Sequence, residues 1–137
     1  MTPPQVALVD ANIVLRFVTG TPTHQAEAAA RLFARAQAGD VDLVLMPPVV
    51  AEVVYVLEGV YDYGSERVQA ELLELLDTGC FRVRDEEAIR RALVRRVTTP
   101  VDFVDVYVSE VARREGFAVA TFDRDFDRLG VNRLQVA

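Results

Sequence analysis

Apolar and polar positions along this chain change in short blocks that predict strands and helices by turns. Five short apolar runs predict strands, the first of them buried, at residues 6–10, 41–47, 80–84, 117–122 and 132–136. The segments between them have helical spacing, at residues 11–18, 23–39, 47–64, 65–79, 85–97 and 98–116. This alternation is typical of an α/β fold with a mostly parallel sheet. We predict three layers, α/β/α, with five strands in a single domain over residues 1–137.

Composition narrows the class of protein. No apolar run reaches the roughly 20 residues of a membrane span, and the first ten residues lack a secretory pattern, so a cytoplasmic protein is expected. The single cysteine, Cys80, can form neither an internal disulfide nor a cysteine zinc cluster. The net charge of −6 argues against a generally basic nucleic-acid surface. It is compatible with an enzyme that reaches phosphates through bound metal ions.

The acid that ends the first predicted strand is the first candidate for chemistry. Asp10 follows the apolar residues 6–9, and open α/β sheets place their sites beyond such strand ends, where the strand order reverses. The structural alternative is an N-cap of the next helix. Asn12, two residues later, could orient Asp10 or only bind the loop.

Three further acids lie on predicted helices. Glu52 lies opposite the apolar face of its helix, near two tyrosines and a glycine, so it is either solvated or functional. Asp105 falls at the edge of an apolar stripe made by Val101, Val104, Val108, Val111 and Ala112. We favour a functional Asp105, because an unpaired carboxylate out of water is costly. Asp102 has capping-box spacing with Thr99, so we interpret it first as a cap residue.

Three aspartates follow the strand predicted at 117–122, at the alternate positions Asp123, Asp125 and Asp127. A calcium-binding EF-hand is excluded, because its sixth and twelfth positions are Arg128 and Leu134 here. Turn formation explains two of the three aspartates. Asp123 follows a strand end as Asp10 does, so the two carboxylates would converge if their strands were neighbours. A divalent cation would remove their repulsion, and hard oxygen ligands suit Mg²⁺ or Mn²⁺.

Four segments together resemble the PIN-domain family, specifically the VapC-type toxins of bacterial and archaeal toxin–antitoxin pairs. They are "LVDANIVLRF", "MPPVVAEVVYVL", "DFVDVYVSEVARREG" and "VATFDRDFDRLG". Their order and spacing cover nearly the whole chain. The resemblance implies a sheet with strand order 3-2-1-4-5, an acidic pocket at the strand ends, and cleavage of RNA that depends on Mg²⁺ or Mn²⁺.

The resemblance also implies roles for individual residues. It makes four acids catalytic, namely Asp10, Glu52, Asp105 and Asp123. All but Glu52 would bind the metal directly or through water, and Glu52 would be a ligand or hold the attacking water. Whether one ion or two are bound stays open. The positions that support or extend this cluster are Asn12, Thr121, Asp125 and Asp102.

The same resemblance implies three partners: an RNA substrate, a cognate antitoxin protein and a second copy of the chain. The helices at 23–39 and 49–63 are surfaces that a twin subunit or an antitoxin helix could cover. Four arginines on one helix could attract RNA phosphates, namely Arg90, Arg91, Arg95 and Arg96. However, acids four residues before Arg90 and Arg91 favour a solvated helix with internal ion pairs.

The sequence also allows two alternatives to a PIN-type nuclease: an enzyme or receiver with a different aspartate chemistry, and a module that only binds. Haloacid-dehalogenase-type phosphatases and receiver domains also place an aspartate after the first strand. The phosphatases need a second aspartate where this chain has Asn12, and both classes use a lysine, which the chain lacks. The other competitor is a PIN-type module that binds RNA or protein without cutting, against which the four acids argue. Mn²⁺-dependent RNA cleavage that is lost in Asp10→Asn would separate enzyme from binding module.

Overall fold

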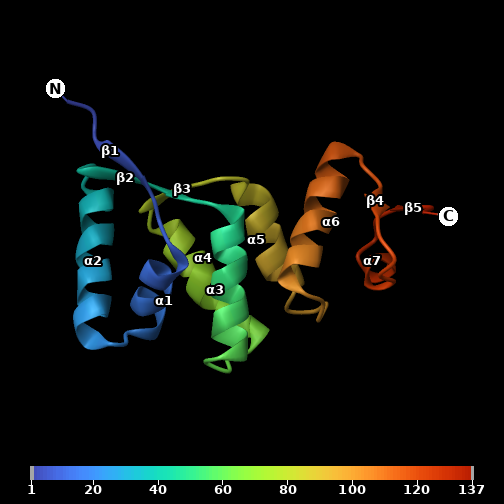
Figure 1. Cartoon of the computed structure of the whole chain (residues 1–137), viewed down its shortest axis with the longest axis horizontal. Coiled ribbons are helices and arrows are strands. Elements are labelled where there is room, and N and C mark those ends of the chain that lie inside the picture. Colours follow the sequence, from blue (N-terminus) through green and yellow to red (C-terminus); the bar gives the residue numbers. More distant parts are fainter. Residues whose placement is uncertain (1, 137) are drawn as a thin grey trace. The chain divides into compact units, whose positions relative to one another are not determined.

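The computed structural model describes residues 2–136 and divides into two compact units, Met1–Asp85 and Glu86–Ala137 (Figure 1). Within each unit the strands that pair run parallel. None of the helices in the described part of the chain combines the length and the hydrophobicity that a membrane span requires. The parallel strands and the helices between them confirm the predicted α/β class.

The first unit places three strands side by side in the order β1-β2-β3 (Figure 1). Its elements are β1 (Gln5–Leu8), α1 (Ala11–Thr19), α2 (Thr23–Gln37), β2 (Val41–Leu45), α3 (Pro47–Gly59), α4 (Ser65–Asp77) and β3 (Phe81–Val83). Leu8 lies opposite Val44 and Leu45 lies opposite Val83. The residues that follow β1 and β2 consequently leave the sheet at the same edge, which is where α1 and α3 begin.

The core of the first unit lies between its central strand and the apolar faces of its helices. Residues 43–45 of β2 are buried, and α3 buries Val50, Val53, Val54 and Leu57 on one face. The first strand differs from the prediction, because Val6 and Leu8 are 57% and 71% exposed and only Val9, just after it, is buried. Val6 and Leu8 are two residues apart, so they lie on the same face of β1, and this face is left uncovered.

The second unit consists of two longer helices followed by short elements. They are α5 (Glu86–Arg95), α6 (Phe103–Glu115), β4 (Val119–Ala120), α7 (Asp125–Arg128) and β5 (Arg133–Leu134). β4 and β5 are parallel, with Val119 opposite Arg133. α6 ends at Gly116, whose φ of 72° is left-handed and whose N–H donates to the carbonyl of Ala112. A glycine at this helix end avoids the strain that a side chain would bring.

The start and the buried face of α6 differ from the prediction. The helix begins at Phe103 and not at residue 98, because Pro100 disfavours helical backbone at the residue before it. Asp102 occupies the N-cap position itself, not the third helical position of a capping box that begins at Thr99, and its side chain makes no capping hydrogen bond, so the predicted capping box is wrong. The buried residues are Phe103, Val106, Ser109, Glu110 and Ala112. Val104 and Val108 are 45% and 37% exposed, so the predicted stripe is wrong at these positions.

The strand pairings of the two units both belong to the expected order 3-2-1-4-5. The first unit contains the neighbours 3-2-1, and the second contains the neighbours 4-5. The pairing of β1 with β4 that would join them stays a prediction. The single domain over residues 1–137 also stays a prediction.

Candidate functional site

Asp10 follows β1 and is the N-cap of α1. Its backbone is extended, with φ −86° and ψ 155°, and its Oδ1 accepts a hydrogen bond of 2.8 Å from the N–H of Ala11. The side chain is exposed and forms no ion pair with any of residues 2–136. The structural role therefore occupies one oxygen of Asp10 and leaves the carboxylate charge without a basic partner in the described chain.

Glu52 lies on α3, the helix that leaves the same edge of the sheet as Asp10. Its exposed face also carries Tyr55, which is 74% exposed, and it lies opposite the buried Val53 and Val54. The predicted apolar face is confirmed at Val50, Val53, Val54 and Leu57 but is wrong at Val60, which follows the helix and is 72% exposed. The side chain of Glu52 forms no hydrogen bond or ion pair within residues 2–136.

Asn12 does not orient Asp10 in this structure. No hydrogen bond joins the two side chains in the described residues. Asn12 instead lines a groove of about 420 Å³ beside α1 and α2, with Arg16 and Gln25, which hydrogen-bond each other at 2.8 Å. Its proposed part in the site is therefore limited to its position two residues after Asp10.

Asp105 lies in the first turn of α6, in the most acidic surroundings of the second unit. Its side chain is half-buried and forms no hydrogen bond or ion pair with residues 2–136. Burial raises the pKa of its carboxyl group, and the negative charges of Asp102, Asp123 and Asp125 raise that pKa further. The charges of three other predicted site residues, Asp102, Asp123 and Asp125, thus act on Asp105 within this unit.

The loop after β4 is held by hydrogen bonds that its backbone N–H groups donate to its own polar side chains. The Oγ1 of Thr121 accepts from the N–H of Asp123, and the Oδ1 of Asp123 accepts from the N–H of Asp125, both at 2.9 Å. These turns are the structural role that the sequence allowed. Asp127 is held instead by Arg133, at 2.8 and 3.3 Å, and is not among the acids that raise the pKa of Asp105. The hydroxyl of Thr121 thus holds the backbone of Asp123, and its role in a catalytic cluster stays a prediction.

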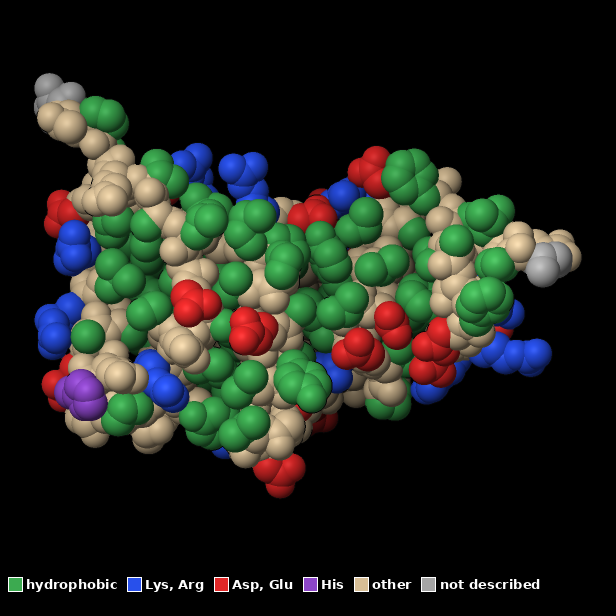
Figure 2. Space-filling model, viewed as in Figure 1, with side chains coloured by type: hydrophobic (Ala, Val, Ile, Leu, Met, Phe, Trp, Pro, Cys, Tyr) green, Lys and Arg blue, Asp and Glu red, His purple; other side chains and the backbone are tan. Residues whose placement is uncertain are grey.

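The chemistry of these side chains fits a hard divalent cation. Figure 2 shows acidic side chains gathered on the visible surface of the second unit. All the donors are carboxylate oxygens, and their mutual repulsion is a cost that Mg²⁺ or Mn²⁺ would offset. Within residues 2–136 no three histidine, cysteine or acidic side chains are grouped closely enough to coordinate one ion in this arrangement. The metal assignment therefore rests on donor type and charge.

The raised pKa of Asp105 predicts how stability should change with pH in metal-free protein. A carboxyl group whose pKa is higher in the folded than in the unfolded chain stabilises the fold below the unfolded value, here 3.8. That contribution is lost as the pH rises through the folded pKa. We expect the free energy of unfolding of the wild type, minus that of Asp105→Asn, to fall from pH 3.8 upwards and then level off. Urea unfolding at a series of pH values measures this difference, and an increase with pH would contradict it.

The sequence did not predict that one aromatic side chain of this region is exposed. Phe122 was assigned to a buried strand, but β4 ends at Ala120 and Phe122 is 84% exposed. The dense aspartates from residue 123 onwards were the available signal, since they mark the end of the strand and place Phe122 in the loop. Its position between Thr121 and Asp123 puts an exposed aromatic ring beside a predicted metal ligand.

Arg90 and Arg91 form ion pairs within their own helix, as the sequence favoured. Their guanidinium groups pair with Glu86 and Glu87 one turn earlier, at 2.8 and 2.7 Å. These are exposed pairs along one helix, which contribute little to stability. They give no reason to place RNA on α5.

Comparisons with known proteins identify the family of this chain. No curated protein matches the chain significantly. Among protein families, the PIN domain matches residues 7–132 of the 137. The matched range includes Asp10, Glu52, Asp105 and Asp123, and it spans most of both units. The chain therefore belongs to the PIN domain family.

Proposed function

We propose that this protein is a metal-dependent endoribonuclease that hydrolyses RNA phosphodiester bonds with Asp10, Glu52, Asp105 and Asp123. PIN domains are in general metal-dependent nucleases, and PIN nucleases bind RNA. The likeness of four segments to VapC-type toxins supports a toxin role. A cognate antitoxin and a second copy of the chain would then be its protein partners.

The observation that carries the proposal is the environment of Asp105. Burial, and then the negative charges of Asp102, Asp123 and Asp125, raise the pKa of Asp105, whose carboxyl group makes no hydrogen bond within residues 2–136. Such an arrangement is accounted for if a cation completes it, because a divalent charge turns the repulsion into attraction. Functional sites are where perturbed carboxyl groups of this kind concentrate.

The proposal requires the acids of the two units to act on one phosphate. Two observations support this. The family match runs continuously through both units, as a single domain would. The β1 strand also has an unpaired edge in the described residues, and the free backbone groups of such an edge favour pairing with another strand. If that strand is β4, Asp10 and Asp123 follow neighbouring strands.

The four acidic side chains would then have different roles. Asp10, Asp105 and Asp123 would hold Mg²⁺ or Mn²⁺, and Glu52 would be a further ligand or orient the attacking water. When bound, such ions neutralise charge on the phosphate and lower the pKa of water. Asp102 and Asp125 add negative charge around Asp105. The hydroxyl of Thr121 fixes the backbone of Asp123, which keeps its carboxylate in place.

Cleavage of a labelled single-stranded RNA by the purified protein tests this function. We expect cleavage with Mn²⁺ or Mg²⁺, none with excess EDTA, and recovery when the metal is restored. The variant Asp10→Asn, prepared in the same way, should be inactive and so excludes a contaminating nuclease. RNA binding without cleavage under every divalent ion would overturn the enzyme and favour a binding module.

A further inference from the structure

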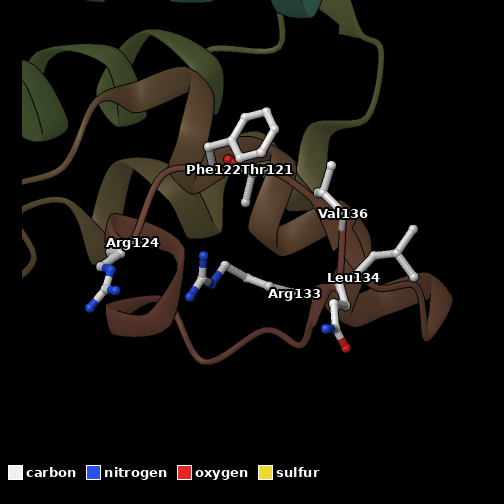
Figure 3. Close-up of a pocket in the computed structure, with 7 residues that line it drawn as sticks. Thr121, Phe122, Arg124, Arg133, Leu134 and Val136 are labelled. Carbon is white, nitrogen blue, oxygen red and sulfur yellow. The ribbon is translucent and has the colours of Figure 1, made fainter.

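A second feature of the loop after β4 is a pocket of about 420 Å³ inside the second unit. Its walls come from Thr121, Phe122 and Arg124 on one side and residues 133–136 on the other. Figure 3 shows Arg133 extending across the opening toward Arg124, with Phe122 and Val136 at other parts of the rim. The pocket therefore combines an aromatic ring with two guanidinium groups.

The aromatic ring of this pocket has no role in the core. Phe122 is the most exposed large apolar side chain of the described residues, at 84%. An exposed phenylalanine contributes almost none of the stabilisation that its burial would give. It is attached between Thr121 and Asp123, whose backbone is held by the threonine hydroxyl. The ring is consequently carried on an ordered loop directly beside a proposed metal ligand.

The two guanidinium groups differ in what they already bind. Arg133 forms a two-bonded ion pair with Asp127. Arg124 is exposed and forms no ion pair with any carboxylate of residues 2–136. An arginine that lies between Asp123 and Asp125 in sequence and has no ion pair in the described residues, in a chain of net charge −6, is suited to an anion that approaches this acidic surface.

We infer that this pocket is a nucleotide subsite for single-stranded RNA, in which a base stacks on Phe122 and a phosphate contacts Arg124. The inference rests on the proposed function, because it places the nucleotide next to the bond that Asp123 would help to cleave. Stacking platforms flanked by arginine are the usual means of holding a single strand. Since every base has a flat face, the subsite accepts any base and requires an unpaired one.

Binding of a short single-stranded RNA that carries one 2-aminopurine tests the subsite independently of cleavage. The fluorescence of this base falls when it stacks, and Ca²⁺ replaces Mn²⁺ in the binding buffer. We expect Phe122→Ala to bind about tenfold more weakly and to lose the quenching, and Phe122→Trp to keep both. The matched control is Phe117→Ala, because Phe117 is 63% exposed at the other end of β4. It should bind like the wild type.

The phosphate contact has its own readout. We expect Arg124→Gln to reduce the slope of log K against log salt concentration by about 0.7, the contribution of one phosphate on a single strand. Arg91→Gln is the control, because Arg91 is exposed and already paired with Glu87. It should leave the slope unchanged.

The outcomes separate the subsite from the nuclease. Binding and quenching that do not change in Phe122→Ala overturn the subsite, even if the wild type cleaves RNA. Quenching that depends on Phe122, in a protein that never cleaves, supports the subsite and overturns the proposed enzyme. Tighter binding to duplex RNA than to the single strand overturns the subsite, because a paired base cannot reach the ring. A wild type that binds no single-stranded RNA also overturns it.

Discussion

Replacing Asp105 with asparagine should lower metal-dependent RNA cleavage by at least about a hundredfold without lowering the free energy of unfolding. Losing a residue that only supports a metal ligand costs about 10- to 100-fold, so a direct ligand should cost more. Stability should hold, because the carboxylate of Asp105 has no hydrogen bond or ion pair in the described residues and is repelled by three aspartates. The neutral amide has nearly the same shape and removes that repulsion.

Three measurements on the same preparations check this expectation. They are kcat/KM for a labelled RNA, urea unfolding at pH 7, and the melting temperature with and without Mn²⁺. Mn²⁺ should raise the melting temperature of the wild type more than that of Asp105→Asn, because only a folded state that binds the ion is stabilised by it. Glu115→Gln, at the exposed end of the same helix, is the control and should behave as the wild type. Full activity in Asp105→Asn would place the metal elsewhere.

The sequence was a good guide wherever burial follows from one element alone. On α3 the period of apolar residues identified the buried face, and Glu52 was correctly placed opposite it. Asp10 was correctly placed after a strand and at a helix start, because an apolar run that stops at an acid has few other interpretations. The parallel pairing of the strands likewise followed from their alternation with helices.

Prediction failed where the partner of a side chain lies on a different element of secondary structure. The apolar stripe of α6 was read from its valines, but Arg95 of α5 binds Ser109 and Glu110 and buries that face instead. The same limit applies to the alternating aspartates. Their spacing could not reveal that Asp127 pairs with Arg133. No periodic pattern within one element encodes a contact with another element, so these roles became visible only in the fold.

Replacing Arg95 with leucine should destabilise the second unit by roughly 3 kcal/mol, the cost of removing one partner from a buried ion pair. The guanidinium is 21% exposed and donates to Glu110 Oε1 at 3.2 Å, while Glu110 is only 7% exposed. It also donates to the Oγ of Ser109 and to the carbonyl of Leu129, beyond α7. One side chain thus joins α5, α6 and the segment that follows the aspartates. Urea unfolding of the full chain measures the loss.

Two comparisons identify the buried carboxylate as the cause of that loss. Arg91→Leu removes an exposed pair with Glu87, so it should cost no more than about 0.5 kcal/mol. Arg95→Leu combined with Glu110→Leu should recover part of the stability, because no charge is then left in the core. A loss in Arg95→Leu as small as that of Arg91→Leu would contradict the argument. It would mean that Arg113, at 3.8 Å from Glu110, neutralises the carboxylate alone and that the hydrogen bond to Leu129 contributes little.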